Sequence, residues 1–207
     1  MSDTFYSWVV FLGQHAFRVT GDSVVLHADR IPRHGPFILA STHTSAYDVP
    51  VLMRASRRRL DFVSITELFR NRKVAWFFSN MNAFPLERNR ADPATVRIIL
   101  DRLERGRAVA MFPEGGIRSE RESIVHGTKF RPGVARIARL AGVKIIPVVV
   151  WGTRQYEQLK SWLPIGQTRY GINFGKPMAI GDEAEGERML AMAYRSLYGE
   201  LRRAMDG

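Results

Sequence analysis

The run Ile145-Ile146-Pro147-Val148-Val149-Val150 decides the fold of this chain, because it is apolar throughout. A strand with one face in water alternates apolar and polar residues, whereas a strand covered on both faces is continuously apolar. The run therefore predicts a central strand of a sheet that has helices on both faces. No apolar run in the sequence reaches the length of a membrane-spanning helix.

Shorter runs rich in β-branched or aromatic residues predict five further strands. These runs are residues 24–27, 36–41, 62–65, 108–112 and 169–174. Helical patterns stand between the strands, and alternating strands and helices are typical of an α/β layer fold. We therefore expect one α/β domain over residues 1–207, with a mixed, largely buried sheet flanked by helices.

Three helices are predicted from their start and stop residues. The first begins at Asp92-Pro93 and ends before Gly106, and the second runs from Pro132 to Gly142. The third is a long C-terminal helix over residues 182–205, which Asp182 caps. The motif-bearing core is expected over residues 21–152.

The composition limits the classes of function. A chain of 207 residues that is 45% hydrophobic can form one domain with a core, and the absence of cysteine excludes disulfides, thiolate metal sites and cysteine nucleophiles. The net charge of +11 favours an anionic partner, which is nucleic acid, an anionic membrane surface or a polyanionic small molecule. The basic residues are densest over residues 54–73, and there we favour a membrane or an acidic ligand.

Residues 1–17 are expected to form a helix with Phe5, Trp8, Val9 and Leu12 at helical spacing. Such a helix lies in a bilayer interface or packs on its own domain, and the sequence does not separate the two. The segment lacks the basic start and the small-residue cleavage site of a secretory signal, so we expect it in the mature protein.

The stretch His43-Thr44-Ser45-Ala46-Tyr47-Asp48 places an imidazole and a carboxylate five residues apart. In a continuous helix these side chains would diverge by about 140°. They meet if His43 lies in the turn after a strand and Asp48 lies in the first turn of the next helix, with Thr44 or Ser45 as the cap. Asp48 would then orient the imidazole as a general base. The alternatives are a hydrogen-bonded structural histidine and an aspartate that compensates the helix dipole.

The sequence offers few groups of its own on which such a base could act. The sequence has no Gly-x-Ser-x-Gly elbow, no Walker-type phosphate loop and no second histidine or carboxylate at a ligand spacing from His43. We therefore expect no metal, and a base that activates a hydroxyl of the substrate.

A second stretch, Phe112-Pro113-Glu114-Gly115-Gly116-Ile117-Arg118-Ser119, follows the strand predicted over residues 108–112. It is a turn with a carboxylate, two glycines and a guanidinium, which suits the binding of a phosphorylated substrate. Both stretches lie at the carboxyl ends of predicted strands, where α/β folds carry their sites.

Together these stretches resemble the motifs of the glycerolipid acyltransferases, especially the 1-acyl-glycerol-3-phosphate acyltransferases. The resemblance runs in the family's order from about Gly21 to Gly152. Its blocks are the His-x4-Asp motif at 43–48, the second block at 84–88, the third from 112 with the segment 129–133 after it, and the fourth at 146–150. The chain departs from the usual Glu-Gly-Thr-Arg-Ser of the third block, because Gly116-Ile117 replaces the single threonine.

The resemblance implies transfer of a fatty acyl group from acyl-CoA or acyl-carrier protein to the free hydroxyl of 1-acyl-glycerol-3-phosphate. It implies His43 as the base that Asp48 orients, and a thioester co-substrate without a further cofactor. It also implies a peripheral protein at the cytoplasmic side of an anionic membrane. The expected substrate-binding residues are Arg88, Glu114, Gly115, Arg118 and Lys129, with the cationic side chains on the acceptor phosphate. Glu114 is expected to accept from a substrate hydroxyl or to orient an arginine.

Two alternatives stay open. Within the class, the acceptor is glycerol-3-phosphate or another lysolipid. In another class, the charge suits a basic nucleic-acid-binding domain, although no aromatic residues are interleaved with the basic ones and we expect no nucleic acid as partner. We interpret Trp76-Phe77-Phe78 as core or as an acyl contact.

Overall fold

The computed structural model of the chain describes residues 3–86, 92–127, 131, 133–163 and 167–207. Arg88 and Lys129, two of the predicted substrate-binding residues, lie outside this part, as does Pro132, the predicted start of the second helix.

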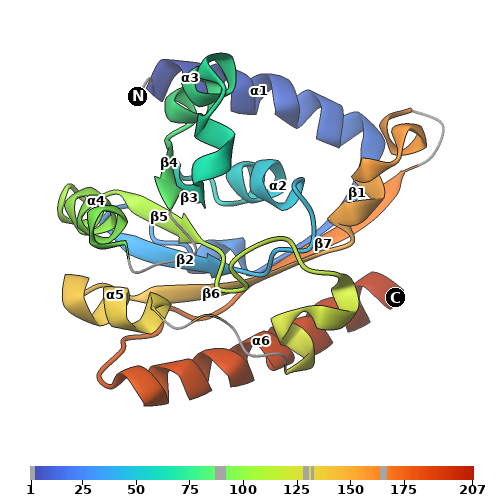
Figure 1. Cartoon of the computed structure of the whole chain (residues 1–207). Coiled ribbons are helices and arrows are strands. Elements are labelled where there is room, and N and C mark those ends of the chain that lie inside the picture. The colour runs from blue at the N-terminus through green and yellow to red at the C-terminus, as the bar shows by residue number, and fades with distance from the viewer. Residues whose placement is uncertain (1–2, 87–91, 128–130, 132, 164–166) are drawn as a thin grey trace.

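The described residues form one α/β domain around a seven-stranded sheet in the order β1-β7-β6-β2-β5-β3-β4 (Figure 1). The strands are β1 (Gly21–Leu26), β2 (Phe37–Ser41), β3 (Leu60–Ile65), β4 (Ala83–Leu86), β5 (Ala108–Met111), β6 (Ile145–Trp151) and β7 (Thr168–Phe174). All residues of β6 are buried, which confirms the interpretation of the apolar run.

The sheet is mixed, as predicted. Strands β6, β2, β5, β3 and β4 are parallel to one another, whereas β7 is antiparallel to β6 and carries β1 parallel to itself at the edge. The carboxyl ends of β2, β5 and β6 therefore lie side by side at one edge of the sheet. The loops that leave these three strands must meet there.

Helices cover both faces of the sheet (Figure 1). One face carries α1 (Asp3–Thr20), α2 (Asp48–Ala55) and α3 (Arg72–Asn80), and the other carries α4 (Pro93–Glu104), α5 (Val134–Ala141) and α6 (Glu183–Asp206). Short 3-10 segments are η1 (Ala28–Arg30), η2 (Thr66–Phe69), η3 (Glu120–Glu122), η4 (Ile124–His126), η5 (Thr153–Glu157) and η6 (Leu159–Trp162). Each face has its own apolar core, so the domain has three layers.

The predicted helix boundaries follow from capping. The Asp92 side chain accepts from the Thr95 N–H at the start of α4, and the Asp182 side chain accepts from the Glu185 N–H at the start of α6. Gly142 ends α5 in the left-handed region, with φ of 64°.

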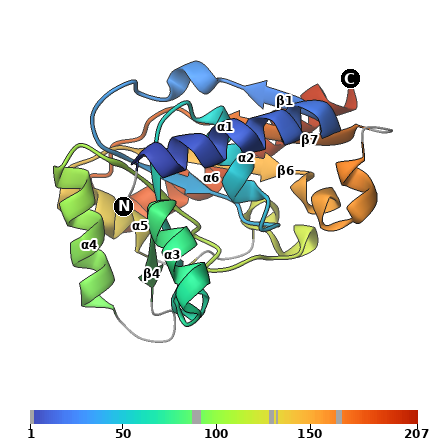
Figure 2. The ribbon, with the colours of Figure 1, turned by 90° about the horizontal axis from the view of Figure 1, so that it is seen from above.

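Three predictions of local structure were wrong or incomplete. Strand β4 and helix α3 were not predicted, and Trp76 in α3 is 60% exposed, so it is not a core residue. The N-terminal helix continues past residue 17 to Thr20, because Phe17 and Thr20 are both buried against the domain. Figure 2 shows α1 lying across α2 with α3 beside it.

Candidate active site

His43 lies two residues after β2, at the sheet edge where the loops after β5 and β6 also emerge. Thr42 fixes this point to β6, because its hydroxyl donates to the carbonyl of Val150 at 3.0 Å and accepts from the Val150 N–H at 2.9 Å. The pairing of β2 with β6 therefore fixes the position of the backbone just before His43.

The imidazole of His43 contacts Asp48, as the spacing predicted. Nδ1 of His43 and Oδ2 of Asp48 are 3.1 Å apart, and Asp48 is the first residue of α2. The predicted cap was wrong: Tyr47 is the N-cap residue and makes no side-chain cap bond. Instead the Asp48 carboxylate reaches back to the loop, where Oδ2 accepts from the N–H groups of Thr44 at 2.7 Å and Ser45 at 3.0 Å.

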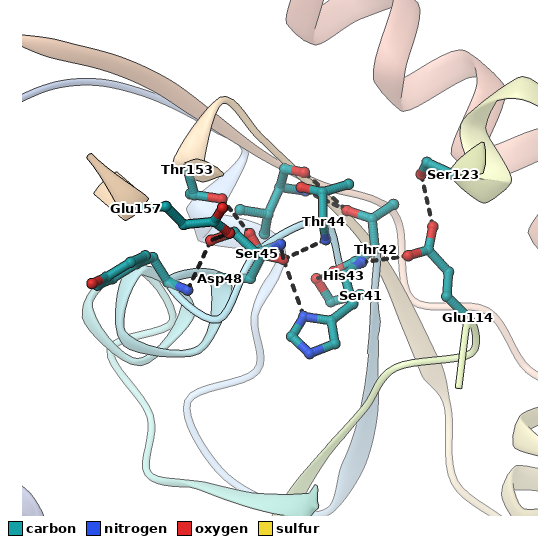
Figure 3. A network of polar contacts seen from close by, with 12 residues as sticks. Ser41, Thr42, His43, Thr44, Ser45, Asp48, Glu114, Ser123, Thr153 and Glu157 are labelled. Atoms are coloured by element: carbon teal, nitrogen blue, oxygen red, sulfur yellow. Dashed lines mark hydrogen bonds and ion pairs between the residues drawn. The ribbon is translucent and has the colours of Figure 1, made fainter. Parts of the chain in front are cut away.

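The Asp48 side chain is fully buried and its two oxygens are both hydrogen-bonded. Oδ1 accepts from the hydroxyl of Thr153, the first residue of η5, which follows β6 (Figure 3). A buried carboxylate needs such donors, because burial without them would disfavour its charged form.

This arrangement fixes the tautomer of His43. A carboxylate oxygen only accepts hydrogen bonds, so Nδ1 of His43 carries the proton that lies toward Asp48. In the neutral ring Nε2 is then the basic nitrogen, and within the part of the chain that the structure describes it has no hydrogen-bond partner. The side chain is 14% exposed, so the ring reaches the surface through its edge.

Phe112, the residue after β5, stacks on the imidazole. The two ring centroids are 4.0 Å apart and the planes are inclined by 20°. Phe62 in β3 stacks behind Phe112 at 6.4 Å, so the ring of His43 rests on a column of aromatic side chains. An imidazolium formed during catalysis would lie over the face of Phe112, where a cation is attracted.

Glu114 lies behind the backbone of His43 and is 3% exposed. Its Oε2 accepts from the His43 N–H at 2.8 Å, while Oε1 accepts from the Ser123 hydroxyl at 2.7 Å and from the Ile124 N–H at 2.9 Å. Figure 3 shows Glu114 and Ser123 on one side of the loop and Asp48 with Thr153 on the other. The Arg118 guanidinium donates to the main-chain carbonyl of Glu114 and not to its carboxylate, whose two oxygens accept from His43, Ser123 and Ile124.

The electrostatic setting of Glu114 combines two opposed effects. Burial raises the pKa of the Glu114 carboxyl above its usual value of 4.5, while the hydrogen bonds from Ser123, Ile124 and His43 lower it. Burial is the larger effect.

Two arginine side chains lie against the turn that contains Glu114 and Gly115. The Arg118 N–H donates to the carbonyl of His43 at 2.8 Å, and the Arg118 guanidinium donates to the carbonyl of Glu114. Gly115 has φ of 71°, which favours glycine, and a Cβ there would lie 2.5 Å from Cδ of Arg131 and would displace the arginine side chain. Arg118 in the loop after β5 therefore contacts the backbone of the base, and Arg131 lies against Gly115 of the same loop.

The structure therefore brings five predicted residues together: His43, Asp48, Glu114, Gly115 and Arg118. Sequence reasoning missed Phe112 and Arg131 as contributors, although both stand inside quoted motifs. It also missed Thr153 and Ser123, which lie outside the motifs and gave no signal of their own.

Among the described residues, no group of three or more histidine, cysteine, aspartate or glutamate side chains could hold a metal ion.

Comparison with known proteins follows this geometry. The sequence matches the family model described as Acyltransferase over residues 23–151. The chain is 29% identical over 168 residues to the 1-acyl-sn-glycerol-3-phosphate acyltransferase of Streptococcus pneumoniae strain ATCC BAA-255 / R6, which covers 79% of this chain and 58% of that protein. It is 24% identical over 192 residues to the Bacillus subtilis strain 168 protein of the same name, with 90% and 91% covered.

A solved structure has the same fold. The crystal structure of the 1-acyl-sn-glycerophosphate (LPA) acyltransferase PlsC from Thermotoga maritima matches with a TM-score of 0.75 at 23% identity, covering 94% of this chain and 78% of that one. The family match spans more than half of the sequence and includes both the motif at residues 43–48 and the motif at residues 112–119. The chain therefore belongs to the acyltransferase family.

Proposed function

We propose that this protein transfers a fatty acyl group from an acyl thioester to the free hydroxyl of 1-acyl-glycerol-3-phosphate. The observation that carries the proposal is the pair of His43 and Asp48. Nδ1 of His43 lies 3.1 Å from Oδ2 of Asp48, which leaves Nε2 as the base. The names of the relatives from S. pneumoniae and B. subtilis support this acceptor.

The proposed step uses His43 as a general base. Nε2 takes the proton of the acceptor hydroxyl while the hydroxyl oxygen attacks the thioester carbonyl, so that a C–O bond forms and a tetrahedral oxyanion results. The oxyanion then collapses, the C–S bond breaks, and the imidazolium returns its proton to the departing thiolate. A positioned base of this kind contributes about 10²–10⁴-fold to the rate.

Asp48 and Phe112 favour the cationic form of the ring in this step. The carboxylate accepts from Nδ1 throughout, so its charge stabilises the imidazolium. The face of Phe112 lies 4.0 Å from the ring and adds a weaker attraction. No serine nucleophile is required, because the acceptor hydroxyl attacks directly.

The acceptor phosphate is assigned to the cationic turn after β5. Arg118 contacts the backbone of His43, and Arg131 crosses Gly115 in the same turn, so a phosphate held there lies near the base. Arginine suits this role because its fork of N–H groups bonds a phosphate at two points. Arg88 and Lys129 stay predicted contributors from outside the described residues.

Membrane association is part of the proposal, because both the acceptor and the product are lipids. Helix α1 leaves Trp8, Phe11 and Leu12 exposed, and α3 leaves Trp76 and Phe77 exposed beside it. Phe5 joins the two helices by edge-to-face contacts with Trp76 and Phe77, at 5.2 and 5.9 Å. Among the described residues no helix is both long and apolar enough to cross a bilayer. We therefore propose that these helices rest in the bilayer interface.

An acceptor panel tests the function. Purified protein is given labelled acyl-CoA, or the same acyl chain on acyl-carrier protein, together with lysophosphatidate, glycerol-3-phosphate or a neutral lysolipid. We expect the fastest transfer to lysophosphatidate, measured as labelled phosphatidate. Faster transfer to glycerol-3-phosphate would select the alternative acceptor, and no transfer from either donor to any acceptor would refute the function.

A further inference from the structure

The turn after β6 contacts the His43–Asp48 pair from the side opposite to Glu114 (Figure 3). Strand β6 pairs with β2, so the residues that follow the two strands lie next to each other. The family match ends at residue 151, two residues before Thr153. The contribution of this turn is therefore not contained in the matched motifs.

We propose that Thr153 is a positioning residue that acts on His43 through Asp48. Its hydroxyl donates to Oδ1 of Asp48, and both side chains are fully buried. Because a carboxylate oxygen only accepts, the single hydroxyl proton of Thr153 must point to Asp48. Among the described residues, Thr153 is the one donor to Oδ1.

The contact of Thr153 matters because the hydrogen-bond donors are divided unequally between the two carboxylate oxygens of Asp48. Oδ2 accepts from the N–H groups of Thr44 and Ser45 and from Nδ1 of His43, whereas Oδ1 has Thr153. Without the hydroxyl, a buried carboxylate oxygen is left without a donor, and the charged form is disfavoured. The carboxyl group is then no longer held at Oδ1 and can rotate, which changes the position of the oxygen that accepts from Nδ1 of His43.

The backbone of the turn is built to present Thr153. Gly152 has φ of 82°, and a Cβ at this position would lie 2.8 Å from the carbonyl oxygen of Arg169. Only glycine fits, so the chain turns sharply at the end of β6 and brings Thr153 over Asp48. Four residues later, Glu157 accepts from the Ser45 hydroxyl at 3.3 Å, which ties the same turn to the loop of the base a second time.

The function of Thr153 rests on the proposed role of His43 as the base. Its test is Thr153→Val, which keeps the shape and removes the hydroxyl, against Thr153→Ser, which keeps the hydroxyl. Thr95→Val is the matched control, because Thr95 is also buried and its hydroxyl donates to an aspartate, Asp92 at the start of α4, outside the candidate site.

Two readouts separate positioning from a merely structural role. We expect Thr153→Val to lower kcat about 10- to 100-fold, the effect of one hydrogen bond to a charged group, with little change in the KM of either substrate. Thr153→Ser should restore most of kcat.

The second readout does not depend on activity. In protein labelled with ¹⁵N-histidine, the ring nitrogens of His43, identified by their loss in His43→Gln, report the tautomer. Wild type and Thr95→Val should show the Nδ1–H form alone, and Thr153→Val a mixture. A single tautomer with unchanged kcat in Thr153→Val would overturn the proposal, as would a mixture in Thr95→Val or a serine variant as impaired as the valine.

The outcomes stay distinct from those of the function. If wild type transfers no acyl group but the tautomer shifts as expected, the positioning role stands and the proposed reaction fails. If Thr153→Val does not fold, Thr153→Ser and Thr153→Ala decide, since only the serine should keep the wild-type ring spectrum.

Discussion

The backbone N–H of His43 donates to Oε2 of Glu114 at 2.8 Å, across 71 positions of sequence. The carbonyl of His43 is held as well, because it accepts from the Arg118 N–H at 2.8 Å. The loop after β5 therefore holds the backbone of His43, while Asp48 holds its ring. Backbone and side chain are positioned by different parts of the domain, so their contributions are separable by mutation.

Replacing the base tests the dyad most directly. We expect His43→Ala to reduce acyl transfer by about 10²–10⁴-fold, because the proton acceptor is lost. The melting temperature should stay near wild type, since the side chain makes one hydrogen bond and its backbone bonds to Glu114 and Arg118 are kept. His34→Ala, at an exposed position, is the control and should be neutral. A collapse in melting temperature with His43→Ala would favour a structural histidine.

Asp48 combines a role in stability with a role in orientation. Asp48→Ala leaves three buried donors unpaired, from Thr44, Ser45 and Thr153, and each costs about 1–3 kcal/mol. We expect a strong loss of unfolding free energy in urea titrations.

Asp48→Asn should lower the free energy of unfolding less than Asp48→Ala does, because the amide oxygen can accept from the two loop N–H groups in place of Oδ2. Activity should still fall, since a neutral amide stabilises an imidazolium less than a carboxylate does. Equal activity of Asp48→Asn and wild type would contradict the role of Asp48.

The raised pKa of Glu114 predicts that the stability of the protein depends on pH. Burial raises the pKa of Glu114 above 4.5, so between the unfolded and folded pKa values the folded state binds more protons than the unfolded state. The free energy of unfolding contributed by this group is then fully present below pH 4.5 and declines as the pH rises through the folded pKa. The variant Glu114→Gln lacks this titration.

The measurement is urea unfolding of both proteins between about pH 4 and 7. The difference in unfolding free energy, wild type minus Glu114→Gln, should become smaller with rising pH. A difference that grows instead would mean that the hydrogen bonds from Ser123, Ile124 and His43 outweigh burial and lower the pKa.

The exposed aromatic residues of α1 and α3 predict membrane binding. We expect the double variant Trp8→Ser and Trp76→Ser to lose flotation with anionic liposomes, because each tryptophan offers a large apolar surface at the interface. The matched control is Leu140→Ser with Met192→Ser, two exposed apolar residues of α5 and α6 on the opposite layer, and it should float as wild type does.

The lipid composition tests the electrostatic part. Arg72 and Lys73 are exposed at the start of α3, and basic residues near an anionic surface contribute about 1 kcal/mol each. Recovery should therefore fall with neutral lipid and with salt. Equal recovery on neutral and anionic vesicles would refute the contribution of charge.

Much of the fold was predictable because hydrophobic pattern and capping are local signals. The continuous run of β6 predicted the centre of the sheet, and Asp92, Gly142 and Asp182 predicted helix ends. The closeness of His43 and Asp48 was also predictable, because a turn followed by a helix start is the local geometry that lets residues five apart meet.

The remaining features depend on contacts between distant segments. Strand β4 is a four-residue edge strand with a proline, too short to give a pattern. Helix α3 exposes Trp76 and Phe77 while Phe78 packs against the core, against the usual rule for amphipathic helices. Thr153 has no local signal at all, since its role comes only from the turn at Gly152. The internal bonding of Glu114 follows from the pairing of β2 with β5, which sequence spacing does not contain.

The pairing of β2 with β6 also has a consequence for biosynthesis. A nascent chain that has emerged from the ribosome only as far as Ala141 contains His43 and Asp48, but it lacks β6 and the turn that follows. Its imidazole has no partner strand to set the loop and no hydroxyl on Oδ1 of Asp48. Because long-range pairs form after local ones, we expect the pair of His43 and Asp48 to reach its final geometry only after residue 153 has been translated and has folded back.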